Sequence, residues 1–115
     1  MAKFAFLYFS DASEYEPSPE AERVYGEIFK WFDTNGPHFV DGGEELQRPA
    51  SATTIRKTNG KVTVIDGPFV EAKESVGGFS IIEAPDMAAA VDIAKTWPGH
   101  GVEVRPILEG RQGGS

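Results

Sequence analysis

The hydrophobic and polar residues follow a pattern that predicts a buried strand and then a long helix. Lys3 to Phe9 is almost wholly apolar and aromatic, and a run this short is typical of a central strand buried on both faces. Ser18 and Pro19 then mark a helix start, because Ser caps free N–H groups and Pro suits the first helical position. An amphipathic stripe at helical spacing follows and ends near Asn35-Gly36-Pro37. Its members are Ala21, Val24, Tyr25, Ile28, Phe29 and Phe32.

A β-hairpin is predicted in the middle of the chain. Residues 52–57 and 61–65 are rich in β-branched side chains and alternate in polarity. Asn59-Gly60 lies between them and tolerates the positive φ angles of a tight turn. A short strand is expected before this hairpin, beginning at 38–40 and running into the polar segment 41–46.

The remaining pattern completes an α+β fold. Phe79 to Glu83 and Val102 to Leu108 predict strands, and between them Asp86 caps a second helix that Pro98 stops. The order is strand, helix, strand, hairpin, strand, helix, strand. This is the plan of a ferredoxin-like βαββαβ sandwich with an inserted β-hairpin. We expect a single domain over residues 1–109 and a flexible C-terminal tail over residues 110–115.

The first strand is apolar on both faces, which bears on assembly. Phe4, Phe6 and Tyr8 alternate with Ala5, Leu7 and Phe9 along it. Helices cover only one face of the sheet in a two-layer fold, so the other face needs a cover. Because monomers seldom expose large apolar patches, we expect a homodimer formed sheet to sheet.

Composition and charge exclude several classes of partner. The formal net charge of -7 opposes binding to nucleic acid and to anionic membranes. Acidic residues gather around the start of the first helix, where we expect solvated surface. They are Asp11, Glu14, Glu16, Glu20, Glu22 and Glu27. The absence of Cys excludes disulfides and thiolate chemistry, and fits a cytoplasmic protein. The N-terminus resembles a strand and not a signal peptide, and no apolar run is long enough for a membrane span.

Four ordered motifs resemble a known family. They are GGEELQ at 42–47, ATTIR at 52–56, DGPFVEAKESVGGFSIIEAPD at 66–86 and VEVRPI at 102–107. In this order and spacing they resemble the DGPF-type branch of the YCII-related family. The resemblance implies a dimeric α+β barrel fold with a cleft between helix and sheet that binds or transforms small molecules. Most members of the family have no assigned reaction.

The DGPF segment supplies the first candidate site residues. Asp66 ends the hairpin. It either accepts hydrogen bonds from backbone N–H groups two residues later, as Asp does in turns, or serves as a general base or ligand anchor. Glu71, Lys73 and Glu74 follow closely, either as surface ion pairs or as groups that reach a ligand. Gly77-Gly78 allows unusual backbone angles, the commoner explanation, or the close approach of another chain or ligand.

Further candidates lie outside that segment. YCII relatives of other branches carry an acid-base dyad of His and Asp, and Asp41 matches the Asp although the first helix region has no His. His38 replaces that partner only if a bulge or bend intervenes, since residues 38 and 41 face opposite sides of a strand. His100 lies in a turn, where His is more often solvated. Arg105 either binds a ligand carboxylate or pairs with Glu71, Glu83 or Glu103.

The sequence leaves two functions open. No ligand spacing for a metal and no phosphate-binding loop is present, so we expect neither metal nor cofactor. The first hypothesis is a cofactor-free lyase or isomerase that moves protons on a small organic molecule with Asp66, Glu71 or a His. The second is a non-catalytic ligand-binding or regulatory module, since the resemblance implies association with extracytoplasmic-function sigma factors.

Overall fold

A computed structural model describes residues 1–11, 16–68 and 74–109. The chain folds into an α+β structure with two α-helices and an antiparallel sheet, in the element order that the sequence predicts. The elements are β1 (Ala2–Asp11), α1 (Pro19–Thr34), η2 (Gly36–His38), β2 (Phe39–Glu45), η3 (Pro49–Ser51), β3 (Thr53–Thr58), β4 (Lys61–Asp66), β5 (Glu74–Ala84), α2 (Met87–Ala94) and β6 (Gly101–Pro106). The predicted tail at 110–115 lies outside the described residues.

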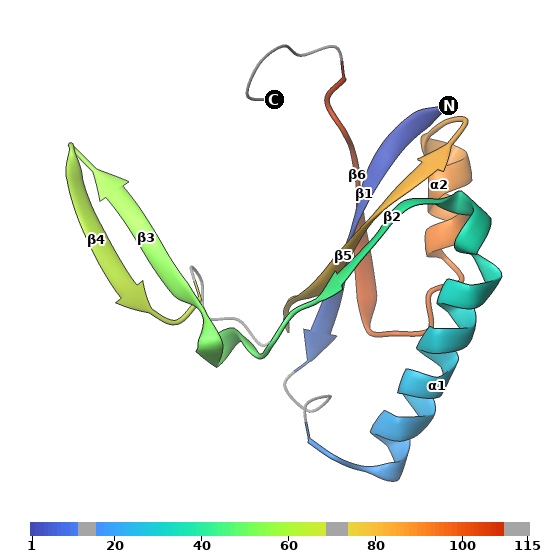
Figure 1. Ribbon diagram of the computed structural model, residues 1–115, viewed down its shortest axis with the longest axis horizontal. Coiled ribbons are helices and arrows are strands. Elements are labelled where there is room, and N and C mark those ends of the chain that lie inside the picture. Colours follow the sequence, from blue (N-terminus) through green and yellow to red (C-terminus); the bar gives the residue numbers. More distant parts are fainter. Residues whose placement is uncertain (12–15, 69–73, 110–115) are drawn as a thin grey trace.

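The main sheet has four strands in the order β2-β5-β1-β6, and each neighbouring pair is antiparallel. Figure 1 shows β1 and β5 at its centre, with β2 and β6 outside them. β2 and β5 are longer than the sequence patterns indicate. The glycines in both segments obscure the alternation that would otherwise mark a strand.

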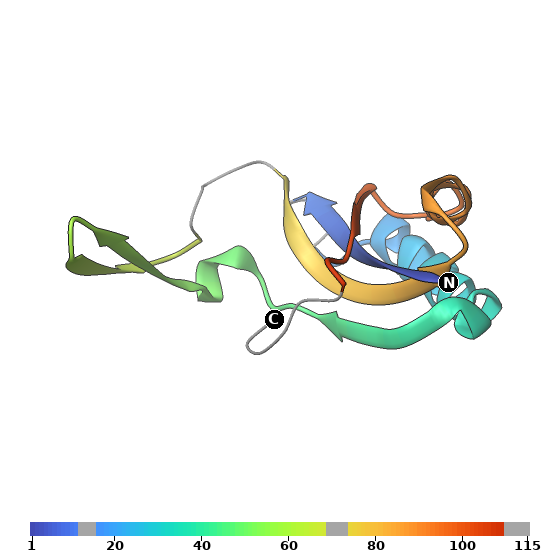
Figure 2. The same ribbon diagram turned by 90° about the horizontal axis from the view of Figure 1, so that it is seen from above.

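Both helices cover the same face of this sheet (Figures 1 and 2). On β1 the residues toward the helices, Phe4, Phe6 and Tyr8, are buried, whereas Ala5 and Leu7 on the other face are only half-buried. The alternation predicted for the first strand is therefore present. One face forms the core, and the other is open in a single copy of the chain.

Aromatic rings dominate the core between the helices and the sheet. Tyr8 lies with its ring centroid 4.3 Å from that of Trp97 and 6.1 Å from that of Trp31. Trp31 is the buried residue of α1, although it lies outside the predicted stripe, and its indole Nε1 donates to Thr96 Oγ1 at 2.8 Å. The hydrogen bond ties the end of α1 to the segment that follows α2.

Side-chain caps begin both helices as predicted. Ser18 Oγ accepts from the amide of Ala21 at 3.0 Å, and Asp86 Oδ1 accepts from that of Ala89 at 2.9 Å. Helix α2 ends at Ala94, earlier than Pro98 alone indicates. No helix among the described residues has the length and apolar character needed to cross a bilayer.

Strands β3 and β4 form a hairpin that we call the arm. Its two-residue turn has positive φ at Asn59 (52°) and Gly60 (77°), which confirms the prediction from these residues. The arm projects from the body on the side of the sheet opposite the helices (Figures 1 and 2). At its base the amide of Gly67 donates to the carbonyl of Ala52 at 2.7 Å.

Candidate functional site

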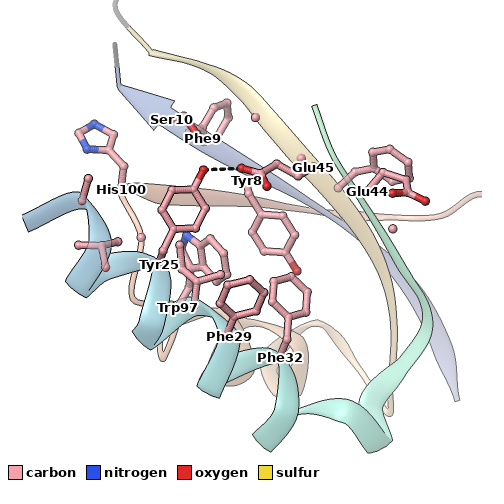
Figure 3. A pocket seen from close by; sticks show the side chains of 18 of the residues that line it. Tyr8, Phe9, Ser10, Tyr25, Phe29, Phe32, Glu44, Glu45, Trp97 and His100 are labelled. Carbon is pink, nitrogen blue, oxygen red and sulfur yellow. Dashed lines mark hydrogen bonds between the residues drawn. The ribbon is translucent and has the colours of Figure 1, made fainter. Parts of the chain in front are cut away.

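A cleft of about 560 Å³ opens between α1 and the helix-facing side of the sheet. We call it the α1 cleft. Figure 3 shows the rings of Tyr8, Tyr25, Phe29, Phe32 and Trp97 gathered along it. Its volume and mostly apolar lining are those of small-molecule sites, which typically enclose roughly 300 to 1,000 Å³.

The cleft exists because the first half of α1 does not seal against the sheet. The residues of the predicted amphipathic stripe all line the cleft. Tyr25 is 41% exposed and Phe29 is 72% exposed, whereas a stripe that packed on a core would be buried along its length. Contact with the core is made near the end of the helix, by the buried Trp31 and by Phe32, the last residue of the stripe. The stripe correctly predicts the helix, but most of it faces a cavity.

Glycines form the opposite wall of the cleft. Gly43 has φ +73°, and a Cβ there would lie 1.6 Å from the carbonyl oxygen of Phe79. Gly78 does not have a positive φ, so its role is close approach: a Cβ would lie 3.0 Å from the carbonyl oxygen of Glu44. For Gly78 this corrects the expectation of an unusual backbone angle. That added Cβ would also lie 3.8 Å from the ring of Tyr8, so glycine here leaves room in the cleft.

Asp41 has a local partner in this wall. Its Oδ1 accepts a hydrogen bond from the amide of Gly43 at 2.8 Å, which stabilises the irregular part of β2. The register of β2 against β5 shifts between Phe39 and Asp41 and again between Asp41 and Glu44. A bulge of the kind that His38 would require is therefore present. Even so, within the described residues no hydrogen bond or ion pair joins His38 to Asp41.

Two polar pairs lie at the lining of the cleft. The Tyr25 hydroxyl donates to Glu45 Oε2 at 2.5 Å. His100 Nε2 lies 2.5 Å from Glu74 Oε2 at the rim, where His100 remains 38% exposed. The structure thus brings together two of the residues that the sequence singles out, Glu74 and His100, and places one of them on the cleft.

A buried chain of hydrogen bonds joins Tyr8 and Gly42, which line the cleft, through Ser80. The Tyr8 hydroxyl donates to Ser80 Oγ at 3.0 Å, and the Ser80 hydroxyl donates to the carbonyl of Gly42 at 2.8 Å. Burial raises the pKa of Tyr8 to about 12, and the hydrogen bond with Ser80 offsets part of this rise. The Tyr8 phenol is therefore neutral at ordinary pH and acts as a fixed donor toward Ser80.

The other candidates lie away from the cleft. Asp66 is exposed at the base of the arm. The hydrogen bond expected from the backbone N–H two residues later cannot form, because that residue is Pro68, which has no N–H. Arg105 lies on the open face and pairs with Glu103 at 2.6 Å, one of the structural partners considered for it. Glu71 and Lys73 lie outside the described residues.

Sequence reasoning did not single out Tyr8, Tyr25 or Glu45 as site residues. Tyr8 and Tyr25 belong to apolar patterns that indicate a core, and Glu45 lies in a motif noted only for its resemblance. Of the acidic residues around α1, Glu16, Glu20, Glu22 and Glu27 are exposed, and an ion pair with Arg23 lowers the pKa of Glu20. The described residues include no group of three His, Asp or Glu that is placed to hold a metal ion.

Comparison with known proteins places these features in a family. The YCII-related domain model matches residues 16–110, which is most of the chain. An uncharacterized protein of Rhizobium meliloti (strain 1021) is 39% identical over 79 residues, or 60% of this chain. The matched region spans 64% of the length of that relative. No reaction is assigned to that relative by its name. The chain belongs to the family of YCII-related domains.

Proposed function

We propose that the α1 cleft binds a small organic molecule with an apolar, preferably aromatic, body and a hydrogen-bond donor or positive charge. One observation carries this proposal: an aromatic cleft of about 560 Å³ has the Glu45 carboxylate at its lining. A cation bound in such a cleft is attracted both by the charge of the carboxylate and by the negative faces of the surrounding aromatic rings.

The same lining disfavours anions. His100 is the basic side chain on the cleft among the described residues, and Glu74 already pairs with it. Glu44 also belongs to the cleft residues, but its side chain points away from the gathered rings in Figure 3. A ligand carboxylate would therefore meet Glu45 without a compensating cation on the described part of the chain.

Two probes of matched shape test this ligand class. We expect 2-naphthylmethylamine, but not 2-naphthoate, to raise the melting temperature and to change the tryptophan fluorescence. Glu45→Gln should weaken binding of the amine by about tenfold or more, because a charge-assisted hydrogen bond is lost. Glu22→Gln on the exposed side of α1 is the matched control and should bind as the wild type does. Equal binding of both probes would contradict the proposed charge preference.

A second candidate is proton-transfer catalysis at the same site, as in a cofactor-free lyase or isomerase. Its support is that the cleft carries both a carboxylate and an imidazole, on Glu45 and His100. General acid–base catalysis requires such groups within reach of one bound molecule. Once a bound compound is identified, exchange of its C–H hydrogens for deuterium, lost in the His100→Gln variant, would separate catalysis from simple binding.

Three finer assignments belong with this proposal. The motif run at 66–86 supports the DGPF-type branch and, through it, a regulatory role beside extracytoplasmic-function sigma factors. The antiparallel order β2-β5-β1-β6 supports the ferredoxin-like arrangement. The half-buried apolar side chains of the open face support a homodimer formed sheet to sheet, as in dimeric α+β barrels.

A further inference from the structure

We propose that the arm of one copy clasps a second copy of this chain, through the arm face that carries Ile55, Val62 and Val64. We call these three residues the arm stripe. The inference rests on the sheet-to-sheet pairing proposed above and adds a second, separate contact to it. It is independent of any ligand in the α1 cleft.

The overall dimensions of the chain exceed those of a compact monomer of this length. Its radius of gyration is 16.3 Å, whereas a compact chain of this length has roughly 13 Å. It exposes 8142 Å², whereas a compact monomer of 12.5 kDa exposes roughly 6,200 Å². The excess is larger than the roughly 800 Å² that each partner buries in a stable complex. A second copy can therefore account for it.

The arm stripe contributes exposed apolar surface to that excess. Ile55 pairs with Val64 across the hairpin, and Val62 lies on the same face. Their exposed fractions are 62%, 64% and 56%, respectively. Isolated two-stranded hairpins are only marginally stable in water. A hairpin with an uncovered apolar face gains most of its stability when something packs against that face.

The arm also differs in charge from the rest of the chain. Residues 53–66 hold three basic residues and one acidic residue, for a net charge of +2. Because the whole chain carries -7, the remaining segments carry -9. The arm of one copy and the body of another are therefore opposite in net charge. This favours a second copy over an acidic protein of another kind, since the chain itself supplies the acidic surface.

The position of the arm indicates where the second copy lies. The helices cover one face of the main sheet, and the arm projects on the other side (Figures 1 and 2). The open face and the arm thus border the same space. Phe79 and Ile81 of β5 continue the apolar surface of Ala5 and Leu7 across the open face. A second copy that packs on this face would lie beside the arm.

A double variant tests the clasp by analytical ultracentrifugation. Ile55→Thr with Val64→Thr keeps β-branched side chains, so the hairpin can still form. Because the dimer has two arms, we expect its dissociation constant to rise roughly 100-fold. Ile65→Thr, on the opposite face of the same hairpin, is the matched control and should change it less than about threefold. An unchanged constant in the double variant, or a monomeric wild type, would overturn the proposal.

An intermolecular measurement tests whether the arm lies close to the second copy. The chain has no cysteine, so Thr63→Cys gives a single spin-label site on the arm face away from the stripe. Labelled variant is mixed with isotope-enriched wild type, and broadening of body amides in the enriched copy is the expected result. A dimer without such broadening would refute the clasp and leave the sheet pairing standing. An arm that instead docks on its own body, or on another protein, would give this same negative result.

Discussion

Replacement of Gly43 by alanine tests the architecture of the cleft wall. The added Cβ would lie 1.6 Å from the Phe79 carbonyl oxygen and 2.5 Å from its carbon. Both are backbone atoms, so no side-chain rotation relieves the clash. A left-handed backbone costs a non-glycine residue roughly 1 to 2 kcal/mol, and separating β2 from β5 sacrifices hydrogen bonds worth about 1 kcal/mol each. We expect a loss of at least about 3 kcal/mol in unfolding free energy.

The neighbouring glycine provides the control. A Cβ on Gly42 has open space around it, so Gly42→Ala should stay within about 1 kcal/mol of the wild type. Urea unfolding followed by tryptophan fluorescence measures both, since Trp31 and Trp97 lie in the aromatic core. All three proteins are compared at one concentration, so that dimer dissociation affects them equally. Similar midpoints for the two variants would refute the steric account of the bulge.

Three further predictions follow from the core and the rim. Because the pKa of Tyr8 is raised to about 12 in the folded state, the neutral Tyr8 phenol stabilises the fold fully below pH 10, and this stabilisation is lost as the pH rises to 12. Urea unfolding should show that the unfolding free energy falls by about 2 to 3 kcal/mol over this pH range in the wild type but not in Tyr8→Phe. Thr96→Val leaves the Trp31 indole N–H unpaired and should cost about 1 to 3 kcal/mol, whereas Thr96→Ser keeps the hydroxyl; equal midpoints in thermal unfolding would contradict the bond's role. Glu74→Gln removes a half-exposed pair with His100 and should change the unfolding free energy by less than about 1 kcal/mol, and a larger loss would show a buried role.

The sequence predicts the secondary structure well because it contains strong local signals for helix caps and turns. Ser18 and Asp86 are helix caps, and Asn59-Gly60 is a turn dipeptide, so each states its local conformation directly. The α+β element order follows from these signals alone. The sequence predicts the ends of β2 and β5 less well, since Gly42, Gly43, Gly77 and Gly78 interrupt the alternation that marks a strand.

Local sequence patterns do not predict the residues of the cleft, although the family resemblance implies a cleft between helix and sheet. An apolar stripe such as that of α1 looks the same whether it faces a packed core or a cavity, because periodicity reports direction and not distance. Glu45 reaches Tyr25 from twenty residues away in the sequence, and only the fold brings them together. The charges of the DGPF segment predict a site there, whereas the cleft in the structure is lined mainly by aromatic residues and glycine.

The irregular register of β2 also affects how the sheet ends. β2 is an outer strand of the sheet, and a regular outer strand offers a row of unpaired N–H and C=O groups to any other extended chain. Two register shifts within seven residues break that row. On the other side, β6 ends at Pro106, which has no N–H to offer. The β2 border of the sheet therefore resists the edge-to-edge growth that leads to fibrils, and Pro106 removes one N–H group from the β6 border.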